Sequence, residues 1–248
     1  MFEHTAVTAR IGLLAPTSNA VMEVEFYRSL PADITVHTTR IPRAGTAVDA
    51  DSMTEMIGNA AQAAAALVQA QPALMVYGHT ASSYLDGPEG DARIARRVSD
   101  AAGVPAITTA GSVVRCLQAI GARRIALAAP YPQAITQTGA TFLRAAGFDV
   151  CAVECLGVDQ GPDLKHVPLQ RTYDLCIRAA ADTDADALFM SGTGVRTREA
   201  IGPLERALGR PVITANLAAL WGALDHLGRT ADFAFGESRL RDWLRRGG

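Results

Sequence analysis

The segment LLAPTSN at residues 13–19 has a counterpart of the same kind, LAAPYPQ, at residues 127–133. In both, a short apolar run passes directly into a turn that contains proline, as expected where a buried strand ends before a helix. Each segment opens a series in which short apolar runs alternate with longer, alanine-rich segments of helical period. This alternation is typical of parallel strands joined by helices, and its repetition predicts an internal duplication. The alternative is that loops of α/β proteins resemble one another without a shared origin.

The two series contain all the predicted strands and helices. Strands are expected at residues 9–14, 34–39, 74–77, 105–107, 125–128, 150–155, 187–190 and 211–213. Helices are expected at residues 50–70, 92–102, 112–120, 133–146, 169–181 and 198–208. The sequence therefore predicts an α/β fold with parallel sheets covered by helices on both faces. Ligands of such sheets bind outside the carboxyl ends of the strands, so two similar halves place a site in the cleft between them.

Composition and charge exclude several classes of function. The chain has 248 residues, of which 49% are hydrophobic and 19% charged, so it is long and apolar enough to form a core. No apolar run reaches the roughly 18–20 residues that span a bilayer. The net charge is −2 and no basic run is present, so we expect neither nucleic acid nor membrane as a partner. The first four residues lack the pattern of a secretion signal, and we expect a cytoplasmic protein.

The four cysteines do not form a recognisable framework. Cys116 and Cys176 lie in predicted helices, and Cys151 and Cys155 lie in one predicted strand. Their spacing does not match a disulfide scaffold or a metal site, so we interpret them as reduced thiols and expect no metal.

Three loops at predicted strand ends carry polar groups. Ser18 and Asn19 stand where a helix begins, where they either bind a carboxylate or cap that helix. The loop GHTASSY at residues 78–84 combines His79 with three aliphatic hydroxyl residues and a tyrosine, and its histidine is either a proton-transfer group or a structural residue. The nearby segment 85–91, rich in glycine and proline, is interpreted as a mobile rim over the cleft or as a solvated turn.

The third loop, SGTGVRT at residues 191–197, allows a close approach of the backbone to a ligand. Arg196 pairs there either with a ligand carboxylate or with Glu199 or Glu205 of the next helix. The glycine spacing does not match a dinucleotide fingerprint or a P-loop, so we expect no nucleotide cofactor.

In their order along the chain, six segments resemble the aspartate/glutamate racemase superfamily. The resemblance is to the branch of maleate cis-trans isomerases, arylmalonate decarboxylases and racemase-like ectoine-utilisation proteins, and it spans essentially the whole chain. The segments are GLLAPTSN (12–19), RIP (40–42), YGHTASS (77–83), APY (129–131), SGTGVRT (191–197) and NLAALW (216–221).

The resemblance implies two pseudo-symmetric Rossmann-like (flavodoxin-like) halves with the ligand cleft between them. Residues 1–115 with 215–248 are expected to form the first half, and residues 116–214 the second. A small carboxylate is the implied substrate, and no metal or organic cofactor is implied. We also expect a homo-oligomer, with large apolar residues such as Trp221 in the core or in a subunit contact.

The chain departs from that family at two positions. Family members can use one cysteine from each half as proton donor, acceptor or nucleophile, and arylmalonate decarboxylases keep only the second. The resemblance places these cysteines at His79 and Gly192. Glycine removes a nucleophile, whereas histidine retains acid and base capacity, so a two-cysteine mechanism is not expected.

The resemblance keeps the positions that bind a carboxylate or stabilise an enolate. It implies that His79, Tyr131 and Thr193 are catalytic, and that the substrate is bound by Ser18, Asn19, Thr80, Ala81, Gly192, Gly194 and Arg196. We predict a cofactor-independent isomerase or lyase, of the decarboxylase kind, that acts on a small carboxylate or dicarboxylate through an enolate-like intermediate. The alternatives are a carboxylate-binding pseudoenzyme and a hydrolase or hydratase in which His79 activates water.

Overall fold

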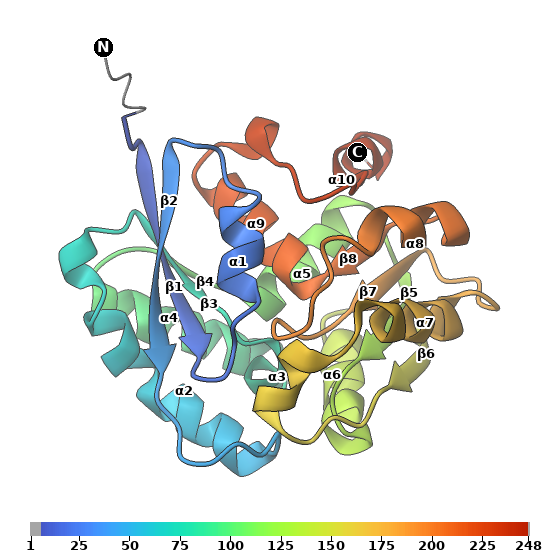
Figure 1. Cartoon of the computed structure of the whole chain (residues 1–248), viewed down its shortest axis with the longest axis horizontal. Helices are drawn as coiled ribbons and strands as arrows, with labels where there is room; N and C mark the ends of the chain where they lie inside the picture. Colours follow the sequence, from blue (N-terminus) through green and yellow to red (C-terminus); the bar gives the residue numbers. More distant parts are fainter. Residues whose placement is uncertain (1–5, 248) are drawn as a thin grey trace.

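Two parallel four-stranded sheets form the framework of the protein, seen in a computed structural model that describes residues 6–247 (Figure 1). The first sheet has the order β2-β1-β3-β4 and the second the order β6-β5-β7-β8. The bounds are Ala9–Pro16 for β1, Ile34–Ile41 for β2, Leu74–Tyr77 for β3, Ala106–Thr108 for β4, Arg124–Ala129 for β5, Asp149–Cys155 for β6, Ala187–Met190 for β7 and Val212–Thr214 for β8. The predicted α/β class and parallel sheets are confirmed.

Helices fill the intervals between the strands. They are α1 Met22–Tyr27, α2 Ala50–Ala65, α3 Thr80–Ser83, α4 Gly87–Ala102, α5 Thr109–Ala119, α6 Gln133–Ala145, α7 Leu169–Ala180, α8 Ile201–Leu208, α9 Ala215–His226 and α10 Leu240–Gly247. Three short 3-10 turns are η1 Val68–Ala70, η2 Gly161–His166 and η3 Thr230–Asp232. The helix expected at 50–70 is thus divided into α2 and η1, and the helix expected at 198–208 begins three residues later, at Ile201.

The segment 85–91 is neither a rim nor a solvated turn, because α4 already begins at Gly87. Pro88 occupies the first turn, where its missing N–H group costs no hydrogen bond. Asp91 is buried, and its carboxylate accepts a hydrogen bond of 2.7 Å from the hydroxyl of Thr108 at the end of β4. The segment therefore packs against the first sheet.

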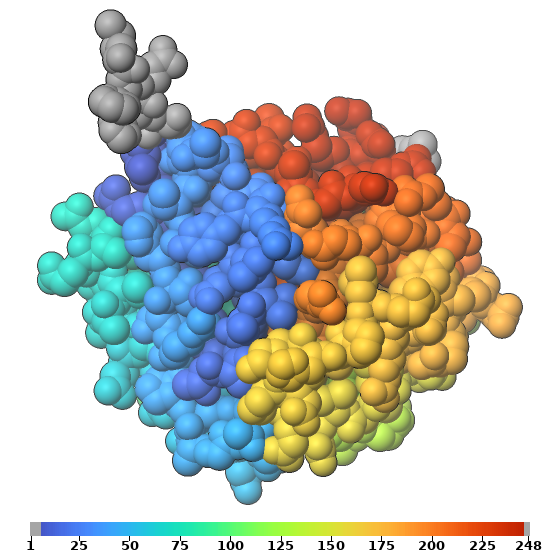
Figure 2. Space-filling model, viewed as in Figure 1, coloured from blue at the N-terminus to red at the C-terminus, as the bar shows by residue number. Residues whose placement is uncertain are grey.

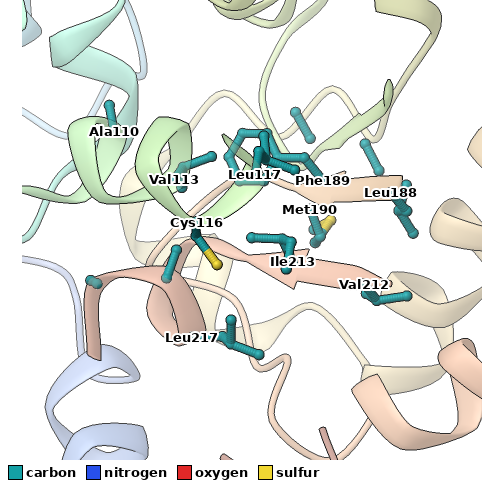
Figure 3. Close-up of a cluster of buried hydrophobic side chains, with 14 of the residues drawn as sticks. Ala110, Val113, Cys116, Leu117, Leu188, Phe189, Met190, Val212, Ile213 and Leu217 are labelled. Carbon is teal, nitrogen blue, oxygen red and sulfur yellow. The ribbon is translucent and has the colours of Figure 1, made fainter. Parts of the chain in front are cut away.

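The two sheets share one hydrophobic core. Helices α2 and α4 cover one face of the first sheet with a separate apolar cluster, whereas α5 and α9 contact strands of both sheets. Figure 3 shows residues of α5 and Leu217 of α9 packed against Leu188, Phe189 and Met190 of β7 and Val212 and Ile213 of β8. These two helices therefore fix the position of one sheet relative to the other.

Both sheets have the same switch point. In the first, the chain runs from β1 to its neighbour on one side, β2, and then crosses to β3 on the other side of β1. In the second, β5, β6 and β7 repeat this order. Loops on either side of such a crossing diverge and leave a crevice at the carboxyl ends of the strands. The loops after β1, β3, β5 and β7 are therefore the ones that border the cleft.

Within residues 6–247, no helix has the length and apolar character needed to cross a membrane. The terminal residues Met1 to His4, on which the expectation about secretion depends, lie outside the described residues.

Candidate functional site

A small cavity lies between the two halves at the carboxyl ends of the strands. Its volume is about 20 Å³, enough for roughly one water molecule. Six of the ten predicted site residues line it, and they come from both halves: Ser18, Asn19, His79, Tyr131, Thr193 and Gly194. The remaining lining residues are Pro16, Arg43, Val48, Met53, Gly161 and Leu164.

Asn19 joins the loops of the two halves. Its Oδ1 accepts from the backbone N–H groups of Val21 and Met22, at 2.9 and 3.1 Å, at the start of α1. Its Nδ2 donates to Thr193 Oγ1 at 2.9 Å, and Thr193 Oγ1 donates to the carbonyl of Gly78 at 3.0 Å. Asn19 therefore caps the helix, and Thr193 uses its hydroxyl proton to connect the loops after β3 and β7. Ser18, by contrast, makes no hydrogen bond to any other described residue.

His79 is held by the short helix that follows it. The side chain caps α3, with Nδ1 3.4 Å from the backbone nitrogen of Ser82 and 2.9 Å from Ser82 Oγ. The Ser82 hydroxyl lies in turn 2.8 Å from the hydroxyl of buried Tyr77. Because the backbone N–H of Ser82 is a donor, Nδ1 must accept, and the hydrogen-bond network assigns the ring proton to Nε2.

The half-buried imidazole of His79 is neutral near pH 7. Burial lowers its pKa to about 3, and the nearby positive charge of Arg43 acts in the same direction. The free protein therefore presents a neutral ring whose Nε2–H is a hydrogen-bond donor.

Tyr131 supplies a buried phenol to the same cavity. Burial raises its pKa above the ordinary value of 10, although the hydroxyl groups of Ser191 and Thr80 act in the opposite direction. Ser191 is also 2.7 Å from the hydroxyl of Tyr84, and Thr80 Oγ1 is buried without a hydrogen bond of good geometry. The Tyr131 hydroxyl therefore stays protonated and serves as a donor.

The position of Gly192 leaves no room for a side chain. Its φ is +102°, in the region that L residues rarely adopt. A Cβ atom here would lie 2.8 Å from Pro130 Cγ and 3.4 Å from the hydroxyl oxygen of Tyr131. The backbone of the loop after β7 therefore approaches the Tyr131 hydroxyl closely.

Four predicted site residues do not line the cavity. Thr80 and Ala81 are buried in α3, and Gly192 is buried beside Pro130 and the Tyr131 hydroxyl without lining the cavity. Arg196 corrects the prediction more strongly, since it is exposed and borders a separate surface hollow beside Arg28, Lys165 and Glu199. It does not pair with Glu205, which is buried and accepts from backbone N–H groups of Val212 and Arg239.

Two loops that the sequence reasoning passed over close the cavity. We call residues 43–48, which follow β2, and 159–161, which follow β6, the clasp. Val48 N–H donates to the Asp159 carbonyl at 2.8 Å, and Gly161 N–H donates to the Thr46 carbonyl at 2.7 Å. Figure 2 shows the yellow surface of the second loop against the blue surface of the first half. The motif RIP at 40–42, directly before Arg43, was the one sequence signal close to this loop.

No cysteine lines the cavity. Cys116 packs in the shared core (Figure 3), Cys176 is buried in α7, and Cys151 and Cys155 lie on β6. Across residues 6–247, histidine, cysteine and acidic side chains do not gather in any group of three or more that could hold a metal ion.

Comparison with known proteins identifies relatives along the whole chain. A family model described as arylmalonate decarboxylase matches residues 11–241. The arylmalonate decarboxylase of Bordetella bronchiseptica is 32% identical over 164 residues, 66% of this chain and 68% of that protein. The maleate isomerase of Nocardia farcinica is 26% identical over 228 residues, 88% of this chain and 90% of that protein.

The fold agrees with these relatives. A crystal structure of a double variant of arylmalonate decarboxylase in its liganded form has a TM-score of 0.85 at 26% identity, and covers 94% of this chain and 98% of that one. The predicted resemblance is thereby confirmed, as is the enzyme type, since the relatives are a decarboxylase and an isomerase. The chain belongs to the arylmalonate decarboxylase family.

Proposed function

We propose that this chain is a cofactor-independent lyase or isomerase that acts on a small carboxylate through an enolate-like intermediate, without a catalytic thiol. The observation that carries the proposal is that two neutral side chains able to donate a hydrogen bond, His79 from the first half and Tyr131 from the second, line one cavity. Neutral donors aimed at a carboxylate stabilise the extra negative charge that develops as it becomes an enediolate.

The reacting carboxylate is proposed to bind between these two donors and the loop residues Thr193 and Gly194, which line the cavity. Loss of CO₂ from a malonate-type acid leaves the bonding electron pair on the α-carbon, delocalised into the remaining carboxylate. The negative charge therefore develops on the oxygens of the remaining carboxylate, where the two donors stabilise it.

His79 is proposed to deliver the proton that completes the reaction. The anionic substrate offsets the charge of Arg43, and its arrival raises the pKa of His79 above the value of about 3 in the free protein. The imidazolium then donates its Nε2 proton to the α-carbon and is protonated again from solvent. Ser82, which contacts Nδ1, is a positioning residue that directs Nε2 into the cavity.

Proton NMR in deuterated water tests this proposal. The purified protein is incubated with maleate, aryl- and alkylmalonates, hydroxy diacids and amino diacids. Deuterium at an α-carbon, or loss of a carboxylate, in the presence of wild type and not of His79→Ala would support enolate chemistry through His79. If no acid reacts while several raise the melting temperature, the protein is the carboxylate-binding pseudoenzyme named above.

The hydrolase and hydratase alternatives are less well supported. A base that activates water needs a free lone pair toward the cavity, and the network around His79 places a proton on Nε2 instead. A homo-oligomeric state and a cytoplasmic location remain predictions.

A further inference from the structure

A second hollow opens at the surface where the two halves meet, outside the cavity. Its volume is about 540 Å³, which lies in the range of sites that bind small molecules. Three segments line it: α1 with the two residues before it, the end of η2, and the loop that follows β7. Figure 2 faces this seam, where the blue surface of the first half meets yellow and orange surfaces of the second. Both halves therefore border the hollow.

The hollow carries positive charge that the described chain does not balance. Lys165 and Arg196 line it, and neither side chain forms a hydrogen bond or an ion pair with another described residue. Arg28 also lines it but pairs with Glu199 at 3.4 Å, so this pair adds no net charge. The chain as a whole has a net charge of −2, so the two free cations do not belong to a generally basic surface. A recess lined by one sign of charge raises the local concentration of counter-ions.

Glu25, the other acid that lines the hollow, is turned toward the interior. Its carboxylate accepts from the backbone N–H groups of Thr197 and Arg198 at 2.8 and 3.0 Å, and from Nδ2 of Asn216 at 2.7 Å. These donors already stabilise its negative charge. Glu25 therefore does not serve as the counter-ion of the two free cations.

The two free cations flank a contact in the wall of the cavity. A Cβ atom built on Gly194 would lie 3.3 Å from Cβ of Leu164, so η2 packs closely on the loop after β7. Both of these residues line the cavity. Lys165 directly follows Leu164, and Arg196 is two residues beyond Gly194. An anion held by both cations would therefore join, from outside, the two segments that meet in the cavity wall.

We propose that the hollow binds a phosphate group through Lys165 and Arg196, and that the bound group strengthens the contact between η2 and the loop after β7. A phosphate monoester carries a charge of about −1.5 to −2 at pH 7, which matches two cations. Its oxygens suit both the fork of a guanidinium and the point charge of an ammonium. The hollow is larger than the group, and Val24, which is 40% exposed, gives it an apolar wall. A phosphate ester with a small apolar part therefore fits it better than the free ion.

Titration calorimetry with inorganic phosphate and with phenyl phosphate, at a fixed chloride concentration, tests the site. We expect phenyl phosphate to bind roughly 3- to 10-fold more tightly, because its ring covers apolar surface. Arg196→Leu and Lys165→Met should each weaken its binding by about 5- to 30-fold. Arg196→Lys should lose less, because the charge remains while the fork is lost. Equal affinity for the two probes would assign the site to the free ion and overturn the role of the apolar wall.

Two control variants locate the bound probe. Arg96→Leu removes an exposed charge from α4, and Tyr131→Phe removes a hydroxyl group from the cavity. Both should bind phenyl phosphate as wild type does. Absence of binding in wild type overturns the site, as does a loss in Tyr131→Phe without a loss in Arg196→Leu. Equal losses in Arg96→Leu and Arg196→Leu would show only a general attraction of anions, which also overturns it.

Amide hydrogen exchange tests the effect of the bound group on the two segments. Phenyl phosphate should slow exchange at residues 161–166 and 193–197 of wild type, because it joins these segments. The same probe should leave exchange unchanged in Arg196→Leu. Unchanged exchange in wild type despite binding would overturn the link to the cavity wall. Neither measurement involves turnover, so this inference can fail while the enolate chemistry stands, and the reverse.

Discussion

The ends of β3 and β7 occupy the same place in the two sheets and supply different things. After β3, His79 begins a helix, and its ring is held by Ser82 and, through it, by Tyr77. After β7, Gly192 turns the backbone with φ of +102° and presents no side chain. One half therefore contributes a side chain that can carry a proton, and the other contributes shape and backbone. The two ends therefore share a position in sheets of the same strand order and differ in their chemistry.

The largest effect on activity should come from the end of β3, where His79 supplies a side chain. We expect His79→Ala to lower kcat/KM by about 100- to 10,000-fold, the usual range for a lost acid or base. His37→Ala, on the half-buried β2, should leave kcat/KM unchanged. Steady-state assays on the acid identified by NMR make this measurement. Full activity of His79→Ala would mean that the end of β3 does not contribute a proton-carrying side chain to the reaction.

Glu25, from the first half, holds the loop that follows β7 in the second half. This buried carboxylate of α1 accepts from the backbone N–H groups of Thr197 and Arg198 and from Nδ2 of Asn216. Glu25→Ala leaves these donors without a partner and should lower the free energy of unfolding by about 3 kcal/mol in urea titrations. Glu199→Ala, which removes an exposed ion pair, should cost no more than about 1 kcal/mol. Equal losses in both variants would argue that the loop after β7 needs no such support.

A substitution at Gly192 should disturb the backbone conformation of the loop after β7. Gly192→Ala meets both the unusual φ and the contact with Pro130, so we expect it to destabilise the protein by roughly 1–3 kcal/mol and to reduce turnover. Gly209→Ala is the matched control, because Gly209 has φ of +65° with nothing within 4 Å of its Cβ position. It should cost about 1 kcal/mol and leave turnover intact. A smaller loss for Gly192→Ala than for Gly209→Ala would show that the loop tolerates a side chain.

Acid should reduce the contribution of neutral His79, after β3, to the stability of the free protein. The pKa of His79 is about 3 in the fold against 6.5 for an ordinary histidine, so between these values the unfolded chain binds the extra proton. Stability due to this group is therefore present above pH 6.5 and is lost as the pH falls, by at most about 1.4 kcal/mol per pH unit.

Buried carboxyls such as Glu25, whose pKa is raised, act in the opposite direction, so the informative quantity is a difference between variants. His79→Asn retains a residue that can cap α3 but does not titrate. The free energy of unfolding of wild type minus that of His79→Asn should fall between pH 6.5 and pH 4. A flat difference would place the pKa of His79 near its ordinary value.

The smallest expected effect concerns the thiols. Cys151→Ser and Cys155→Ser change side chains on β6 outside the cavity, so kcat/KM should not change. The double variant, assayed beside wild type, is sufficient. A large loss would require a thiol in the reaction and would remove the reason for assigning the proton to His79.

The positions of the strands were the most predictable part of the molecule. The predicted strands at residues 74–77 and 187–190 agree with β3 and β7 residue for residue, because each is a short apolar run with proline, glycine or polar residues within two positions of its ends. The start of α4 at Gly87 was not predicted, since a glycine followed by proline favours a turn as readily as a first helical turn. Local pattern therefore located the buried elements better than the ends of the exposed ones.

The candidate site was predictable where a loop directly follows a strand and not elsewhere. Ser18, Asn19 and His79 line the cavity because the strand before each of them aims it there. Arg196 was misplaced because the direction of a side chain beyond a turn depends on the path of the loop, which its neighbours in sequence do not determine. Arg43 and Gly161 were missed because they meet only through the packing of one half on the other.

The clasp should affect the rates at which a ligand enters and leaves the cavity. The carbonyls that hold Arg43, those of Thr46 and Ala47, belong to the same loop that pairs with the second half. Because the cavity holds only about 20 Å³, we expect a carboxylic acid to enter after a change in its walls, and the pairing of the clasp loops forms one of those walls. We expect a ligand that enters to be released slowly, because release again requires the clasp hydrogen bonds between the two halves to break.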